Sequence, residues 1–375
     1  MDGLAIMHKG IEKIAAQEIK ELIGAKCVLG ETVVRFEIEG LLDLCALCYR
    51  AQSVAKVLLL LGQTHAKDEE AIAAYAGTLD FSTFLTKDKT FRVRCVRVGE
   101  HSFDSADIEQ GVGGALAEKY SCTANLDDPD VPVYVYVHQD TCYLGIDFAG
   151  VDLSKRQYRI FAPAEQLRAT TAYAMLRIAG FSRKISLLDP FCGSGTILIE
   201  AALSACDYPL NFHDKDRFAF HRFPPLKKED ITTLFAKLDK RITAPDTRIV
   251  GYDSFLKNVK AAQKNAKIAG INKRIDVSKI DVEWLDTKFD KGEVDLILTD
   301  PPIMTKIKEK VMKKVYKEFF YQAEFVLKKE GKIVLVTPVP DAFSPFATEY
   351  HFVEKERVAV EQGKQRLYVL VFGHA

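Results

Sequence analysis

The segment that most constrains the fold is LLDPFCGSGTILIEAAL, residues 187–203. An apolar run ends in Asp189, a loop of small residues follows, and a helical pattern begins after Thr196. A strand that passes through glycines directly into a helix is typical of a sheet with crossover helices. In open α/β sheets, ligands bind beside such loops, at the carboxyl ends of the strands. The segment therefore predicts a parallel sheet with a ligand site after one of its strands.

Short apolar runs alternate with helical patterns over residues 169–375. The runs are SLLDPF, RIVGYD, RIDVSK, VDLILTD, KIVLVTP and RLYVLVFG. This alternation favours a mostly parallel sheet with helices on both faces, which defines an α/β domain.

The preceding residues show two smaller α+β patterns and a connector. Residues 10–24 predict an amphipathic helix that ends at Gly24, and strand and helix patterns follow as far as position 62. The second pattern ends in two predicted strands joined by a polar turn, in VPVYVYVHQDTCYLGIDFAG. The predicted boundaries are 1–62 and 63–153 for the two α+β domains, 154–168 for the linker and 169–375 for the α/β domain.

The strand pattern FRVRCVRV, residues 91–98, changes phase after Cys95. Arg92 and Arg94 share one face of a regular strand, whereas Arg97 falls on the apolar face. A bulge near Cys95 would return Arg97 to the arginine face; without a bulge it stays on the apolar side.

Composition narrows the class of protein. Of the 375 residues, 48% are hydrophobic, and 52 basic residues balance 52 acidic ones. Nucleic-acid binding often accompanies a basic chain, so any such surface here must come from local clusters. Neither an apolar run of about 18 residues nor a signal-peptide layout is present, so we expect a cytoplasmic protein without a membrane span.

The eight cysteines lack the spacing of a disulfide framework. Cys45 and Cys48 form one CxxC inside an apolar helical pattern, without the second ligand pair of a zinc site. We expect buried free thiols here, and no metal site is predicted.

The loop after Asp189 suits a cationic ligand. Gly193 and Gly195 allow a ligand to approach the backbone closely. A nicotinamide dinucleotide would favour a third glycine where Leu198 stands, and the GK[ST] signature of a Walker loop is absent. S-adenosylmethionine carries a sulfonium and an ammonium group, so it fits an acid ahead of the loop better than a pyrophosphate does.

Two further acids follow predicted strands. Asp253 ends RIVGYD, where a carboxylate can accept hydrogen bonds from both ribose hydroxyls of an adenosyl group. Its alternative role is to cap the helix that follows. Asp281 follows the next strand and could accept from the adenine amino group, although an acid there could also be an ordinary surface residue.

The catalytic candidate is Asp300-Pro301-Pro302, at the end of VDLILTDPPIM. The prolines fix the backbone and remove N–H donors, so the loop is expected to present only acceptors: a carboxylate and bare carbonyls. Two such acceptors can hold the protons of an aromatic amino group and direct its lone pair toward a methyl donor. Asp300 or a water could then take the proton. The structural alternative is a proline-rich turn.

Basic clusters offer candidate contacts to the phosphates of a nucleic acid. They comprise Lys155, Arg156 and Arg159 in the linker, residues 306–317 (KIKEKVMKKVYK) after the catalytic loop, and Arg92, Arg94 and Arg97. A solvated charged face is the alternative for each cluster.

At these residues the chain resembles the THUMP-containing RNA methyltransferases, class I enzymes with a Rossmann-like catalytic domain. DPFCGSGTILIEAAL resembles that family's cofactor loop, and DPPI matches three of the four positions of its catalytic tetrapeptide. HKGIEKIAAQEIKELIG, YLGIDFAGVDLSKRQYRIF and APAEQLRATTAYAML also fit. The resemblance implies a ferredoxin-like domain and a THUMP domain, followed by a seven-stranded, mostly parallel methyltransferase domain.

The resemblance also implies an activity and site residues. It is closest to the enzymes that make N2-methylguanosine at tRNA position 6, in which the THUMP part captures the tRNA 3′ end and presents the acceptor stem. No obligatory protein partner is implied. The implied cofactor-binding residues are Thr170, Asp189, Phe191, Cys192, Gly193, Ser194, Gly195, Thr196, Asp253, Ser254, Asp281 and Val282. The implied catalytic residues are Asp300, Pro301 and Pro302, with Ile303, Lys155, Arg156 and Arg159 as substrate contacts.

One position departs from the family pattern. Ile303 stands where an aromatic residue stacks on the target base, and such stacking is worth roughly 1–3 kcal/mol per base. Three readings therefore stay open: a tRNA guanine-N2 methyltransferase, a methyltransferase acting on rRNA or another amino-bearing base, and a catalytically silent RNA-binding relative. The presence of Asp300 argues against the silent relative.

Overall fold

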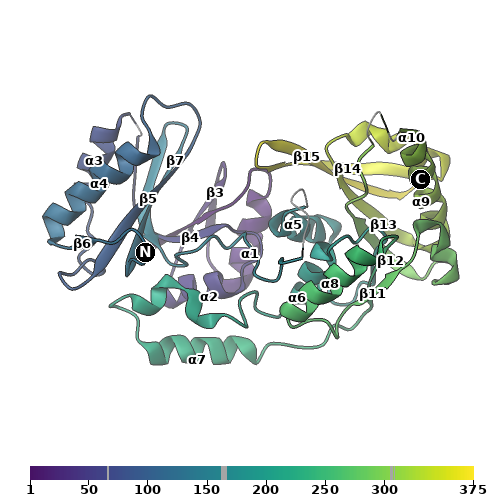
Figure 1. Ribbon diagram of the computed structural model, residues 1–375, viewed down its shortest axis with the longest axis horizontal. Helices are drawn as coiled ribbons and strands as arrows, with labels where there is room; N and C mark the ends of the chain where they lie inside the picture. Colours follow the sequence, from purple (N-terminus) through teal and green to yellow (C-terminus); the bar gives the residue numbers. More distant parts are fainter. Residues whose placement is uncertain (66, 162–166, 305–306, 308) are drawn as a thin grey trace. The chain divides into compact units, whose positions relative to one another are not determined.

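The computed structural model describes residues 1–65, 67–161, 167–304, 307 and 309–375. The chain divides into two compact units. The first unit contains residues 1–7, 15–153 and 214–240, and the second contains residues 8–14, 154–213 and 241–375. Figure 1 labels the helices and strands.

One eight-stranded sheet runs through the first unit. Its strand order is β2 (Cys27–Gly30), β3 (Val33–Glu37), β1 (Asp2–Ile6), β4 (Lys56–His65), β8 (Thr141–Asp147), β7 (Val131–His138), β5 (Thr90–Val98) and β6 (Thr123–Ala124). Strand β4 pairs with β1 on one side and with β8 on the other. The two N-terminal α+β patterns therefore share a single sheet, joined at the strand that spans position 62.

The helices of this part of the chain include one over the predicted amphipathic segment, residues 10–24. They are α1 (Glu12–Ile23), α2 (Leu41–Arg50), α3 (Glu69–Thr78) and α4 (Ser105–Tyr120). Gly24 ends α1 with a φ of 74°, a conformation that glycine adopts at little cost. Cys45 and Cys48 are buried in α2, and all eight cysteines are free, as predicted.

Strand β5 contains no bulge. It pairs with β7 without interruption from Phe91 to Val98, so Arg97 lies on the same face as Cys95. Its guanidinium donates to the Asp104 carboxylate at 3.0 Å and to the Ser105 hydroxyl at 3.2 Å, at the start of α4. Arg97 therefore stays on the apolar side of the strand, where these two acceptors satisfy its charge.

Residues 214–240, within the predicted α/β domain, fold with the first unit. They form η1 (Lys215–Arg217), η2 (Ala219–Arg222) and α7 (Lys228–Asp239). The ring of Phe223 packs edge-on against Phe148, with centroids 5.2 Å apart. The Tyr49 ring lies 4.2 Å from that of Phe235. Burial of such rings contributes about 1.5–3 kcal/mol each, which explains why the segment docks there.

The second unit is built on a seven-stranded sheet. Its order is β11 (Asp276–Lys279), β10 (Ile249–Asp253), β9 (Leu187–Asp189), β12 (Val294–Thr299), β13 (Leu327–Thr337), β15 (Gln365–His374) and β14 (Phe352–Gln362). β15 pairs antiparallel with β13 and β14, and the other pairings are parallel. The predicted mostly parallel α/β sheet is confirmed.

The helices of the second unit connect these strands. They are α5 (Ala169–Ala179), α6 (Thr196–Ala205), α8 (Leu256–Ile268), η3 (Val282–Thr287), α9 (Glu309–Val326), η5 (Pro340–Ala342) and α10 (Ser344–Glu349). Among the described residues, no helix is long and apolar enough to cross a membrane.

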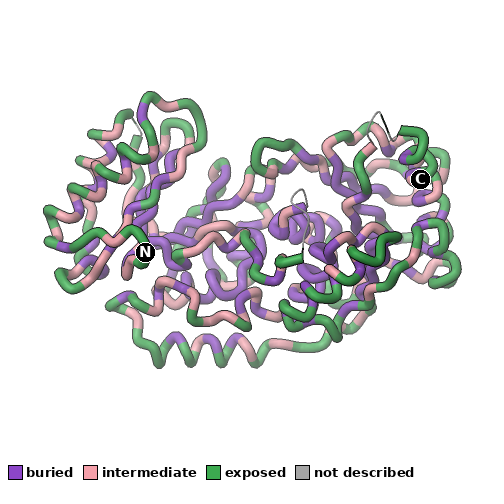
Figure 2. The backbone as a smooth tube through the Cα atoms, in the orientation of Figure 1, coloured by how far each residue is buried: buried purple, intermediate pink, exposed green. Residues whose placement is uncertain are grey.

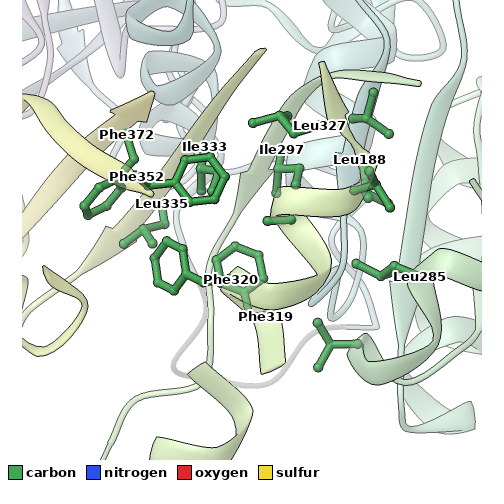
Figure 3. Close-up of a cluster of buried hydrophobic side chains, with 14 of the residues drawn as sticks. Leu188, Leu285, Ile297, Phe319, Phe320, Leu327, Ile333, Leu335, Phe352 and Phe372 are labelled. Atoms are coloured by element: carbon green, nitrogen blue, oxygen red, sulfur yellow. The ribbon is translucent and has the colours of Figure 1, made fainter. Parts of the chain in front are cut away.

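The core beneath one face of this sheet fixes helix α9. Figure 3 shows Phe319 and Phe320 of α9 beside Leu335, with Ile333, Phe352 and Phe372 nearby. The Phe320 ring lies 5.8 Å from Phe372 and 6.0 Å from Phe352. Figure 2 shows how buried residues concentrate along the strands. Because α9 follows the catalytic-loop candidate, this packing anchors the segment that comes after that loop.

Candidate active site

Asp189 ends strand β9 and is almost completely buried. Its Oδ1 accepts a hydrogen bond from the Thr299 hydroxyl of the neighbouring strand β12 at 2.6 Å. The same oxygen accepts from the Phe191 amide at 3.2 Å. Burial raises the pKa of Asp189 to about 8, and the nearby Asp300 and Asp253 carboxylates add to the rise. A cationic ligand at this point would favour the ionised form.

The two glycines of the loop perform different tasks. Gly193 has a φ of 52°, and its amide donates to the Asp253 carboxylate at 3.1 Å. Gly195 has a φ of 83° and precedes α6. A Cβ at Gly195 would lie only 2.9 Å from the Ala262 Cβ of α8. Gly195 therefore allows close packing against α8, whereas Gly193 lines the cavity described below.

Asp253 ends the adjacent strand β10 and organises the loop around it. Its Oδ1 accepts from the Phe255 amide at 2.8 Å. The Asn258 side chain donates to both carboxylate oxygens, at 3.0 and 3.1 Å. Asn258 was not predicted from the sequence; its position in the first turn of the helix after a strand-end acid is the signal that could have identified it.

Asp300 follows β12, beside Asp189, and is half-buried. Burial raises its pKa to about 7. The Pro302 carbonyl accepts a hydrogen bond from the Tyr316 hydroxyl at 2.7 Å. The expectation of bare carbonyls is therefore wrong for Pro302, because the buried phenol of α9 needs an acceptor.

Tyr316 is a positioning residue that sequence reasoning missed. Its ring is buried and stacks on Phe343, with centroids 4.3 Å apart. It is separated from Pro302 by fourteen positions, and it follows a helical pattern in which an aromatic residue is typical of ordinary core.

One cavity of about 560 Å³ brings most of the predicted residues together. This volume lies within the usual range for small-molecule sites. The predicted residues that line it are Asp189, Phe191, Cys192, Gly193, Ser194, Thr196, Asp253, Ser254, Asp281, Val282, Asp300, Pro302 and Ile303. The residues that were not predicted are Leu167, Pro190, Ile197, Phe255, Asn258, Met312 and Val315.

Three of the predicted cofactor-binding and catalytic residues do not line this cavity. Gly195 serves the packing of α6 on α8, and Pro301 is buried beneath the loop surface. Thr170 is buried in the first turn of α5, and its hydroxyl has no hydrogen-bond partner in the part of the chain that the structure describes.

The linker residues Lys155, Arg156 and Arg159 have different environments. Lys155 is exposed and Arg159 is half-buried. The Arg156 side chain is fully buried and donates to both carboxylate oxygens of Glu200, at 2.9 and 3.1 Å. The proposed phosphate contact is therefore wrong for Arg156, since its charge is sequestered in the core.

The basic residues of the other two clusters also have different environments. Residues 306 and 308 lie outside the described residues. Lys313 and Lys317 on α9 pair with Glu309 and Glu349. Arg92 donates to the Leu126 carbonyl at 2.6 Å. Arg94 is exposed, with Glu109 at 3.9 Å.

The strand order, with one reversed strand and acids at the carboxyl ends of β9, β10 and β12, defines a class I methyltransferase. Residues 156–367 match the model of the RMKL-like methyltransferase domain, and residues 66–147 match that of the THUMP domain. The chain belongs to the family of RMKL-like methyltransferases that carry a THUMP domain.

Curated relatives match along most of the chain. A tRNA (guanine(6)-N2)-methyltransferase of Methanocaldococcus jannaschii is 30% identical, and the match covers 97% of each chain. The enzyme of the same name from Archaeoglobus fulgidus is 30% identical over 92% of this chain and 85% of its own length.

Solved structures agree with this fold. The crystal structure of TrmN from Thermus thermophilus superposes with a TM-score of 0.74 and 25% identity, covering 100% of this chain and 99% of that one. SMU.472, solved in complex with S-adenosylhomocysteine (SAH), gives a TM-score of 0.85 at 20% identity, covering 100% and 98%.

Proposed function

We propose that this protein transfers the methyl group of S-adenosylmethionine to the exocyclic N2 of a guanosine in tRNA, at position 6 of the acceptor stem. The observation that carries the proposal is that Asp189, Asp253 and Asp300 border one cavity at the ends of three neighbouring strands. The near full-length similarity to the archaeal position-6 enzymes supports the choice of substrate.

The chemistry of the cavity fits the methyl donor. Four carboxylates line it, those of Asp189, Asp253, Asp281 and Asp300, and no lysine or arginine among the described residues does. Such a lining favours a ligand that carries sulfonium and ammonium charges and disfavours a pyrophosphate. When bound, S-adenosylmethionine supplies an electrophilic methyl group. We propose that Asp253 accepts from its ribose hydroxyls and Asp281 from its adenine amino group; both acids line the cavity.

The loop of small residues would hold the other end of the donor. Gly193, Ser194 and Thr196 line the cavity beside Asp189, whose carboxylate can face the cationic groups. Phe255 and Val282 also line the cavity next to Asp253 and Asp281, where they offer apolar surface to the purine. Phe255 is 61% exposed, so a planar ligand could cover its ring.

Asp300 would orient the amino group of the target base. As a carboxylate it accepts one N–H proton of that amino group. The Pro302 carbonyl already accepts a hydrogen bond from Tyr316. The two prolines and Tyr316 hold this loop rigid, so orientation is established before transfer. With a pKa of about 7, Asp300 can also receive the proton that the amino group releases.

The wall beyond Asp300 is apolar but not aromatic. Ile303 is 46% exposed, and Met312 and Val315 line the cavity with it. We propose that these aliphatic side chains contact the target base in place of a stacked ring. Ile303 is also the observation that favours a second candidate, methylation of another amino-bearing base or of rRNA.

Methylation of purified RNA tests the proposal directly. The protein is incubated with tritiated S-adenosylmethionine and unmodified tRNA or rRNA, and the products are digested and identified by mass spectrometry. N2-methylguanosine in tRNA, lost when position 6 is changed from G to A, is the expected result. Label in rRNA or in another nucleoside would select the second candidate, and no label in any RNA would overturn both.

We place this activity in the cytoplasm, without a protein partner. Activity of the purified chain alone on tRNA would agree with the second point. A strict requirement for an added cell fraction would contradict it.

A further inference from the structure

Helix α8 carries four lysines on one face. Lys257, Lys260, Lys264 and Lys267 follow a spacing of three, four and three positions, which places them along a single stripe. All four side chains are exposed, and the opposite face buries Val259, Ala262, Asn265 and Ala266. The stripe spans about 15 Å along the helix axis at a rise of 1.5 Å per residue.

The charge of this stripe is not compensated locally. Helix α8 contains no acidic residue. Within the described ranges, none of the four lysines forms an ion pair, whereas Lys313 and Lys317 of α9 do. An ordinary solvated helix in a chain with equal numbers of acids and bases would mix both signs along its face.

The stripe begins at the cavity and is flanked by exposed aromatic rings. Phe255 and Asn258, at the start of α8, line the cavity. The Lys257 ammonium lies 5.8 Å from the Phe255 ring centroid. Further along, the Lys264 ammonium lies 4.7 Å from the Phe161 centroid, and Phe161 is 41% exposed.

The backbone of Phe161 is held in place by the Asn265 side chain. The Asn265 side chain accepts from the Phe161 amide and donates to its carbonyl, both at 3.1 Å. The Asn265 side-chain amide also donates to the Ser194 carbonyl in the cofactor-loop candidate at 3.0 Å. Asn265 is completely buried, so it fixes the linker, the helix and the loop together.

We propose that the lysine stripe of α8, together with Phe161, binds the sugar-phosphate backbone of the RNA substrate and leads it to the cavity. This inference rests on the proposed function and names the surface of the catalytic domain that RNA would use. Lysines alternating with exposed rings along a track suit RNA, because ammonium groups neutralise phosphates and rings stack on unpaired bases. An acidic protein would not need a track that ends at a cofactor-sized cavity.

A double variant tests the stripe without touching the cavity. K260Q/K264Q removes two charges in its middle and leaves Lys257 and Asn258 intact. The matched control is K329Q/K332Q, two exposed lysines at the start of β13, at the opposite end of the sheet strands. Fluorescence anisotropy with tRNA transcripts at several salt concentrations gives the affinity and its salt dependence.

The expected result is a roughly tenfold loss of tRNA affinity for K260Q/K264Q. The slope of log K against log salt should fall in magnitude by about 1.4–1.8, since each of the two phosphates that are no longer neutralised lowers it by roughly 0.7–0.9. SAH affinity should be unchanged, K260R/K264R should restore binding, and the control variant should behave as wild type. A K260Q/K264Q protein with wild-type affinity and slope would overturn the inference while leaving methylation by the wild type intact. Absence of methylation by the wild type would instead overturn the proposed function.

Discussion

The side-chain amide of Asn258 donates to both carboxylate oxygens of Asp253, the acid that borders the donor cavity at the end of β10. Asp253 ends β10, and Asn258 lies in the first turn of the helix α8 that follows. The start of the helix therefore orients the carboxylate at the end of the strand. The backbone amides of Gly193 and Phe255 donate to the same carboxylate. Together these donors explain why Asp253 keeps a defined direction at the cavity.

Replacing Asn258 should therefore weaken donor binding through Asp253. We expect N258A to raise the Kd for S-adenosylmethionine roughly tenfold, which corresponds to about 1.4 kcal/mol. Isothermal titration calorimetry gives the measurement, and N272A, which alters an exposed asparagine just beyond α8, is the control. Equal affinity of N258A and wild type would mean that Asp253 does not hold the ribose.

Asp300 should control methyl transfer and its pH dependence. Its pKa is raised to about 7, and the carboxylate is the form that accepts the amino proton. Single-turnover transfer at saturating donor should rise between pH 6 and 8 with a midpoint near 7, and D300A should abolish transfer while SAH binding stays nearly unchanged. If D300A loses both transfer and SAH binding, Asp300 has a structural role instead.

Ionisation of Asp189 should lower the stability of the unliganded protein as the pH rises. Its folded-state pKa of about 8 lies above the unfolded value near 3.9, so folding favours the protonated form. The contribution of Asp189 to the free energy of unfolding is therefore fully present below pH 4. It declines by up to about 1.4 kcal/mol per pH unit as the pH rises and levels off above pH 8.

The D189N variant isolates this contribution. Urea unfolding without donor should show D189N increasingly more stable than wild type from pH 5 to 8, and its donor affinity should be lower. D290N, at an exposed carboxylate, should follow wild type. A wild-type stability that does not fall relative to D189N over this range would contradict the assignment.

Ile303 should tolerate an aromatic replacement if it is an apolar wall for the target base. We expect I303Y to preserve or raise turnover on tRNA, because stacking adds roughly 1–3 kcal/mol to base contact. A strong drop in kcat would show that the cavity is shaped for a different base.

Replacing Arg156 should lower the stability of the fold and leave RNA binding unchanged. R156M leaves the buried Glu200 carboxylate without its charged partner, and breaking such a pair costs about 3–5 kcal/mol. Thermal unfolding measures this loss, and K155M at the exposed neighbour should be close to neutral. If R156M kept its stability and lost tRNA affinity, the side chain would have to leave the core to meet RNA.

The sequence predicted the parts of the site that sit at strand ends. An apolar run followed by an acid marks such a position, so Asp189, Asp253 and Asp300 were identified from local pattern alone. The six apolar runs of residues 169–375 each match a strand of the second sheet. Strand β14 was missed because five of its eleven residues, FVEKERVAVEQ, are charged and interrupt the apolar run, as suits an edge strand with exposed residues.

The features that were missed depend on contacts between distant positions. Tyr316 serves the catalytic-loop candidate through one hydrogen bond across fourteen residues, and nothing in its own helix indicates this. Lys155 and Arg156 are adjacent and look equivalent in the sequence, yet only Arg156 meets Glu200. Burial of such charges is decided by tertiary partners, which local composition does not reveal.

Because residues 214–240 pack with the first unit, the gene cannot be divided into two separately folding parts by one cut after residue 153. A cut after residue 153 would deprive Phe148 and Tyr49 of the aromatic partners that come from downstream, and would leave α7 with its apolar stripe in water. THUMP and catalytic parts joined in this interlaced manner cannot be exchanged between relatives by a single crossover, so they are expected to be inherited together.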